Sequence, residues 1–285
     1  MERTRRSQTE YNPDIKKYYD EIEKEFGFVP EFVKAFPVYG FDGAWEEVKA
    51  LYLNQNTVLP QKLKDLISIS IDSQIPCGYC GFMDQKFGEA DGVTLAEKKE
   101  AIAMAALTRH WSSFLNGSNI DELDFECEVD LIFDHLGKQV AGRKEIHHED
   151  AVPSIETAGD AYEDIKVTLG VVPEFMQRFP RFAIAGAWKE MKHLQLNPNT
   201  SLSPKHKELI GLAVASQIPC KYCTYFHTLA ARFHGASDDE ISETLAIAGL
   251  ARHWSAVING AMLDVEKFRS EIQRMVQTVS RKMAA

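Results

Sequence analysis

The sequence has no long apolar run and no excess of basic charge. No stretch of the 285 residues reaches the roughly 18 consecutive apolar residues that a membrane-spanning helix needs. The N-terminal residues 1–8 carry positive charge but no apolar segment follows them, so we expect no signal peptide. Lys and Arg number 32 against 42 Asp and Glu, a net charge of −10. Because phosphate groups are neutralised by clustered basic side chains, this balance argues against nucleic-acid and anionic-membrane partners and predicts a soluble cytoplasmic protein.

Cysteine is also scarce, with five in the whole chain. A small secreted protein built on disulfides would be shorter and richer in cysteine. Four of the five form two C-x-x-C pairs, Cys77 with Cys80 and Cys220 with Cys223. In a cytosolic chain such pairs indicate redox or metal chemistry. Cys127 lies alone in an acidic stretch, and we expect it to be an inert thiol.

The sequence also lacks convincing runs of alternating apolar and polar residues, so strands are not expected and the fold class is predicted to be all-α. Ser203-Pro204 is typical of a helix N-cap followed by proline, which predicts a helix over 205–217. Its segment 209–215 is apolar on every face, so we expect this helix to be central and buried. Ser237 and Thr94 each precede a glutamate at capping-box spacing and predict two further helices.

The chain is an internal duplication. Adding 143 to a position in the first half finds its match in the second. Matching segments include 27–32 with 170–175, 43–45 with 186–188, 73–77 with 216–220, and 109–112 with 252–255. We therefore expect two tandem copies of one helical domain, residues 14–143 and 157–285, forming a pseudo-dimer within one chain.

Three segments lie outside the clearest part of this repeat. The acidic stretch 121–134 is predicted to be helical, and the polar stretch 137–154 to be a surface linker or the lead-in to the second copy. Residues 264–283 have an amphipathic helix pattern that could pack across the other copy or across another subunit.

The chemistry is concentrated between Lys207 and His227. With Cys220 near a helix start, Cys223 and His227 fall on the same helical face. A helix N-terminus lowers the pKa of a thiol, and two thiols at this spacing can cycle between dithiol and disulfide. His227 lies one turn beyond Cys223 and can take or return its proton. Glu208 belongs to the apolar preceding helix and needs a partner, which a proton relay through His227 or a water would supply.

Other interpretations stay open from the residues alone. The C-x-x-C pair could be half of a zinc site or two inert buried thiols, and Glu208 could be a salt-bridged structural carboxylate. The motif Arg-His-Trp occurs in both copies, at 109–111 and 252–254. Its residues, His253 among them, either pack between the copies or lie close to the thiols.

Once these residues are in view, the pattern E-x11-C-x-x-C-x-x-x-H over 208–227 resembles the AhpD-like alkylhydroperoxidases of the carboxymuconolactone decarboxylase superfamily. The segment G-x-V-P-E-F followed by F-P, present in both copies, is similar to the peroxidase-related branch. The resemblance implies an AhpD-like helical bundle, a homo-oligomer and a thiol peroxidase that needs no bound cofactor or metal.

The resemblance also implies roles for single residues. Cys223 would be the peroxidatic cysteine, Cys220 the resolving cysteine, and Glu208 with His227 a proton relay. The peroxide would be reduced at the expense of a thioredoxin-like or lipoyl-type dithiol. One departure is Tyr222, which stands where the best-studied family peroxidase has a further histidine.

The first copy departs further. Asp65 takes the place of Glu208, and Asp84 that of His227. A carboxylate beside a thiol raises the pKa of that thiol, which disfavours the nucleophilic thiolate. We therefore expect Cys77 and Cys80 to form a weaker or structural pair.

Two other functions stay open at this point. One is a decarboxylase or lactone-processing enzyme of the same superfamily, whose chemistry needs no thiol pair. The other is a non-catalytic redox sensor or scaffold that changes its assembly on oxidation.

Overall fold

The computed structural model describes residues 14–75, 77–142 and 154–283, and every regular element in these ranges is helical. The first repeat contains α1 (Ile15–Phe26), α2 (Glu31–Lys34), α3 (Val38–Glu47), η1 (Val48–Tyr52), α4 (Gln61–Gln74), α5 (Gly78–Ala90), α6 (Leu95–Ser118) and α7 (Glu122–Gly142). The second contains α8 (Ala158–Leu169), α9 (Glu174–Arg178), α10 (Ile184–Glu190), η3 (Met191–Gln195), α11 (Pro204–Gln217), α12 (Lys221–Phe233), α13 (Asp238–Gly260) and α14 (Val265–Met283). The all-α prediction is confirmed, and the two series correspond element by element.

Local signals set several helix ends. The Ser203 side chain accepts a hydrogen bond from the backbone N–H of His206 at 3.2 Å, and Pro204 begins α11. Thr94 and Ser237 each close a complete capping box, at the start of α6 and α13. After α12, Gly235 takes a φ of +82°, a conformation that favours glycine. The starts at Ser203, Thr94 and Ser237 agree with the sequence predictions.

The predicted linker over 137–154 is wrong in its first part, because α7 runs on to Gly142. Side-chain pairs one turn apart support the helix there. Lys138 pairs with Asp134 at 2.5 Å, and Gln139 contacts His135 at 2.6 Å. Gln139 also donates to the carbonyl of Val167 on α8 at 3.4 Å, which attaches this part of α7 to the second repeat. Residues 143–153 of that prediction lie outside the described ranges.

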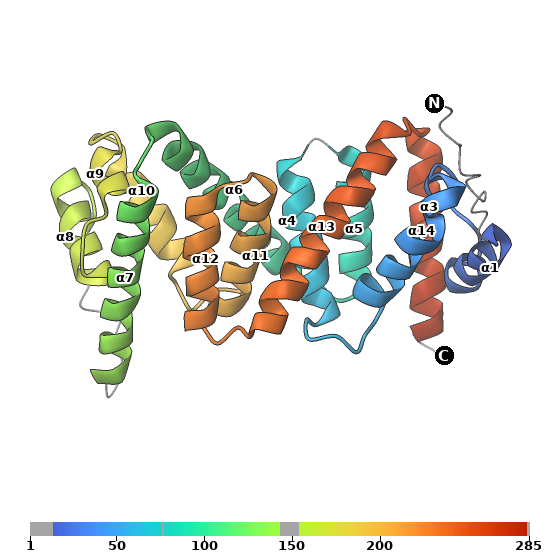
Figure 1. Ribbon diagram of the computed structural model, residues 1–285, viewed down its shortest axis with the longest axis horizontal. Helices are drawn as coiled ribbons and strands as arrows, with labels where there is room; N and C mark the ends of the chain where they lie inside the picture. The colour runs from blue at the N-terminus through green and yellow to red at the C-terminus, as the bar shows by residue number, and fades with distance from the viewer. Residues whose placement is uncertain (1–13, 76, 143–153, 284–285) are drawn as a thin grey trace, which may run out of the picture.

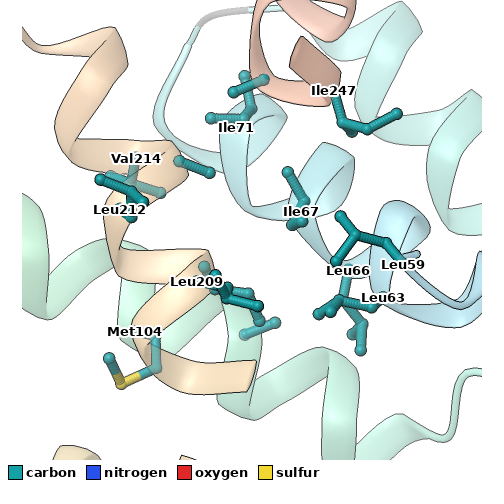
Figure 2. Close-up of a cluster of buried hydrophobic side chains, with 14 of the residues drawn as sticks. Leu59, Leu63, Leu66, Ile67, Ile71, Met104, Leu209, Leu212, Val214 and Ile247 are labelled. Atoms are coloured by element: carbon teal, nitrogen blue, oxygen red, sulfur yellow. The ribbon is translucent and has the colours of Figure 1, made fainter. Parts of the chain in front are cut away.

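Four helices, α4, α6, α11 and α13, pack together at the centre of the elongated molecule (Figure 1). They share one apolar cluster, to which Leu66, Ile67, Met104, Leu209 and Ile247 contribute (Figure 2). The segment 209–215 of α11 is fully buried, as its apolar sequence predicts. The two repeats therefore share a core.

The last helix of each repeat packs against the cysteine helix of the other. Helix α7 contacts α12, and α14 contacts α5 as well as α1. The amphipathic pattern of the C-terminal stretch thus serves to cover the other copy, one of the two outcomes that the sequence allowed. Helices α1 and α14 lie together at one end of the molecule and α8 to α10 at the other (Figure 1).

A buried lysine fixes the repeats to each other at two matching places. In the second repeat, Lys207 donates to the carbonyls of Leu194 at 2.7 Å and Asn197 at 2.6 Å, and pairs with Glu100 of the first repeat at 3.3 Å. In the first repeat, Lys64 makes the same set of contacts, to the carbonyls of Leu51 and Asn54 and to Glu243 of the second repeat.

Among the described helices, none is long and apolar enough to cross a bilayer.

Candidate thiol active site

The site of the second repeat begins at the N-terminus of α12. Cys220 occupies the N-cap position, where its Sγ accepts a hydrogen bond from the backbone N–H of Cys223 at 3.3 Å. Both cysteines are free thiols and both are buried. The cap position lets a sulfur satisfy a backbone N–H that the helix itself leaves unpaired.

The two thiols differ in acidity. The pKa of Cys220 is lowered to about 6, first by a hydrogen bond from the Cys223 thiol and then by the Cys223 backbone N–H and the side chains of Ser112 and Asn116. The pKa of Cys223 is raised, because its proton is held by Cys220 and because it is buried. Within the reduced pair, these shifts favour the thiolate at Cys220 and the protonated thiol at Cys223.

Glu208 and His227 form a buried pair beside these thiols. The imidazole Nδ1 lies 2.7 Å from Oε2 of Glu208, whose two oxygens also accept from Nε2 of Gln195 at 3.0 and 3.3 Å. The other ring nitrogen, Nε2, lies 3.3 Å from the hydroxyl of Thr108. Since a carboxylate accepts, we infer that Nδ1 carries the proton and that Nε2 accepts from Thr108. The ring is thus held at both nitrogens.

Gly211 on α11 makes room for this ring. A Cβ added there would lie only 2.5 Å from Nδ1 of His227, closer than such atoms approach one another. The corresponding residue of the first repeat is Ser68, which faces a site with no histidine. Gly211 was not singled out in the sequence, where it is one small residue in an apolar run.

One wall of the site comes from the other repeat. Thr108, Ser112 and Asn116 are spaced four residues apart on α6 of the first repeat, and they reach His227 and the two thiols. The matching positions on α13 are Ala251, Ser255 and Asn259. The spacing of the three polar residues is visible in the sequence, but no local signal shows that they face a helix more than a hundred residues away.

A cavity of about 50 Å³ leads to the site. Its polar lining consists of Cys223, His227, Thr108 and Gln195, and most of the remaining wall is apolar. Trp111, from the first Arg-His-Trp motif, also lines it. Cys220 does not line the cavity. Its more acidic sulfur is therefore less accessible from the cavity than the sulfur of Cys223.

The first repeat has a different site on the same frame. Cys77 and Cys80 form a disulfide. Asp65 accepts from the Tyr52 hydroxyl at 2.5 Å. Burial raises the pKa of Asp65 to about 8 and that of Asp84 to about 6. Carboxyl groups thus stand where the second repeat has its glutamate–histidine pair.

Asp72 adds a further buried carboxyl on α4, and burial raises its pKa to about 11. No group of three or more His, Cys, Asp or Glu side chains in the described ranges is arranged to hold a metal ion.

Two remaining sequence candidates, Tyr222 and His253, make a hydrogen bond and a ring contact with residues other than the thiols. The Tyr222 hydroxyl donates to the carbonyl of Ile120 at 2.6 Å, which attaches α12 to the connection between α6 and α7. His253 is exposed and stacks on Phe36 of the first repeat with ring centroids 5.5 Å apart. Its neighbour Trp254 lines the cavity of the first repeat, so each Arg-His-Trp motif serves the site of the opposite copy.

Comparison with known proteins bears on the second repeat above all. Residues 173–263, which contain Glu208, Cys220, Cys223 and His227, match the model of the carboxymuconolactone decarboxylase family. No curated protein sequence matches the chain. A solved structure of a proposed gamma-carboxymuconolactone decarboxylase subunit from Burkholderia xenovorans LB400 is similar with a TM-score of 0.53 and 17% identity, over 96% of this chain and 100% of that one. At this identity the likeness concerns the fold. In sequence, the second repeat is thus similar to the carboxymuconolactone decarboxylase family over residues 173–263.

Proposed function

We propose that this protein is a thiol-dependent peroxidase that reduces a hydroperoxide at Cys223. The observation that carries the proposal is the cavity that brings Cys223 together with His227, whose ring is held by Glu208 and Thr108. A nucleophile beside a base, with that base oriented by a third group, is the arrangement that activates a thiol.

In the first step, Nε2 of His227 takes the proton of Cys223 by way of the Thr108 hydroxyl, and Glu208 stabilises the resulting imidazolium. The Cys223 thiolate attacks the terminal oxygen of the hydroperoxide. A sulfur–oxygen bond forms while the O–O bond breaks, which oxidises Cys223 to a sulfenic acid. The departing alkoxide takes the proton from the imidazolium and leaves as the alcohol.

In the second step, the Cys220 thiolate attacks the sulfenic sulfur. The disulfide forms, the sulfur–oxygen bond breaks, and hydroxide leaves to become water on protonation. The low pKa of Cys220 favours this step, because the thiolate is the attacking form. The same frame in the first repeat holds Cys77 and Cys80 as a disulfide, which supports closure of the pair in the second.

An external dithiol then restores the pair by thiol–disulfide exchange, in which it gives up two electrons and becomes a disulfide itself. A thioredoxin-like or lipoyl-type dithiol fits this role, and the cycle uses no bound cofactor. The family resemblance also favours a cytoplasmic homo-oligomer.

The test is peroxide consumption with a panel of candidate dithiols, in the full chain and in two double variants. Cys220→Ser with Cys223→Ser should abolish turnover, whereas Cys77→Ser with Cys80→Ser should not. Equal losses in both variants would contradict the assignment of the active site.

Two further outcomes would favour the alternatives. A thiol content that peroxide leaves unchanged would favour a lactone-processing or decarboxylating reaction. A single oxidation that shifts the size-exclusion profile without multiple turnovers would favour a redox sensor.

A further inference from the structure

The four tryptophans differ in whether the indole N–H has a hydrogen-bond acceptor. Nε1 of Trp45 donates to Glu21 at 3.2 Å, and Nε1 of Trp188 donates to Asp164 at 2.7 Å. Nε1 of Trp111 and of Trp254 is buried, and neither has an acceptor within the described part of the chain. A buried N–H without an acceptor is costly, so such a group indicates a missing oxygen or nitrogen partner.

Both of these tryptophans line a cavity, one in each repeat. The cavity with Trp254 belongs to the first repeat and has a volume of about 110 Å³, against about 50 Å³ for the cavity with Trp111. Two residues that line the larger cavity are smaller than their counterparts at the other one: Asp84 in place of His227, and Ala251 of the second repeat in place of Thr108. The larger cavity thus lies where the catalytic histidine is missing.

The lining of the larger cavity defines what fits it. Its wall is mainly apolar, with the rings of Phe26, Phe32, Trp45 and Phe87. The polar groups include the Trp254 indole as a donor and the Asp84 carboxyl, 7% exposed, as an acceptor. Cys80 also lines the cavity, but its sulfur is bonded to Cys77, so no thiol nucleophile is present. These features suit binding rather than turnover.

We propose that the cavity of the first repeat is a binding site for a small neutral alcohol with an apolar body. The indole N–H of Trp254 donates a hydrogen bond to the hydroxyl oxygen, and the Asp84 carboxylate accepts a hydrogen bond from the hydroxyl group. The ligand has about five non-hydrogen atoms, since a cavity of roughly 150 Å³ holds benzene. The site does not depend on peroxidase activity in the second repeat.

Three molecules of the same shape separate the alternatives: isobutanol, 2-methylbutane and isobutylammonium. The hydrocarbon cannot partner either polar group, and the ammonium offers no acceptor to the indole N–H. Occupancy is read from the methyl resonances of Met83 and Met275, which both line the cavity, in methionine-labelled full-length protein. Variants at each methionine assign the signals.

Isobutanol should shift both methyl signals saturably and bind at least fivefold more tightly than the other two molecules. Trp254→Phe, which keeps an aromatic ring but removes the donor, should weaken isobutanol binding at least fivefold. Trp111→Phe is the matched control in the other repeat and should leave it unchanged. In the wild-type chain, the Trp254 indole resonance should move with the same affinity as the methyl signals.

Equal binding of 2-methylbutane, tighter binding of isobutylammonium, or an unaffected Trp254→Phe variant would each overturn the proposal. Evidence that the Trp254 indole N–H contacts only water at saturating isobutanol would also overturn the proposal. If Trp254→Phe fails to fold, the wild-type indole titration still decides between these outcomes.

Discussion

Cys220 and Cys223 have the same side chain, but each has only one of two properties expected of a catalytic thiol, a lowered pKa and access to the cavity. Cys220 sits at the helix cap and has the lowered pKa, whereas Cys223 lines the cavity. A sequence shows the spacing of such a pair but not which sulfur is acidic. The acidity depends first on which thiol donates to the other, and then on hydrogen bonds from Ser112 and Asn116 of the other repeat. In the proposed mechanism, this division gives each sulfur one nucleophilic step.

The first prediction concerns the acidity of Cys220. Its pKa of about 6 lies below the ordinary thiol value, so the thiolate should form as the pH rises through about 6 and be lost below it. The ultraviolet absorbance of the thiolate, followed against pH in the reduced full chain, should show this step. Cys220→Ser should remove it, and Cys127→Ser should not. A step that survives in Cys220→Ser would assign the acidic thiol elsewhere.

The second prediction concerns Gly211. Gly211→Ala places a methyl group against the His227 ring, which must then move away from Glu208 or Thr108. We expect kcat/KM for peroxide to fall at least tenfold, in line with the general contribution of a positioned acid–base group. Gly249→Ala on α13 is the control, because nothing lies within 4 Å of the added atom. Similar kcat/KM values for both variants would show that the added methyl group does not displace the His227 ring.

At the scale of elements, the buried lysines act where two helical repeats meet. Lys207 is fully buried, and its charge is matched by Glu100 and two carbonyl groups. Glu100 in turn accepts from the backbone N–H groups of Ser201 and Leu202, which begin the approach to α11. Each such lysine therefore links a loop of its own repeat to a helix of the other.

The third prediction follows from this contact. Lys207→Met leaves the Glu100 carboxylate buried without its cation, and we expect the free energy of unfolding to fall by about 3 kcal/mol. Lys221→Ala removes an exposed ion pair with Glu122 and should cost less than about 1 kcal/mol. Urea unfolding of both variants measures the difference. Equal losses would mean that the buried pair contributes no more than a surface pair.

Elements with local signals could be predicted from the sequence, and contacts between repeats could not. The cap at Ser203 and the box at Ser237 depend on residues within one turn, so their spacing is sufficient. The end of α7 was missed because contacts of Gln139 with His135 and Val167 extend it past Gly137. In the site, the motif found Glu208 and His227, which meet across two adjacent helices. Thr108 was beyond reach, since its role depends on how α6 of one repeat lies against α12 of the other.

On the scale of the whole molecule, the two repeats cannot be regarded as separate bodies. Each gives its last helix to the other, and four helices share the central core. Such an arrangement holds the halves together by packing rather than by the chain that joins them.

The fourth prediction tests this packing. A protease site inserted between Lys144 and Glu145, and cleaved in the folded protein, should leave the two halves associated. Size-exclusion chromatography without denaturant should give the profile of the uncut chain of 32.2 kDa. Denaturing gels should show two fragments from the same fraction. Separation into halves in native buffer would contradict the shared core.

The threonine that holds His227 belongs to the repeat with the aspartates. In evolutionary terms, the first repeat could change its own site residues, but it could not lose its fold without disrupting the site of the second repeat. Natural selection on activity in one half therefore acts as selection on the architecture of the other. A duplicated gene of this design keeps both copies even when only the second one reacts, because the first forms part of the wall of the candidate site in the second.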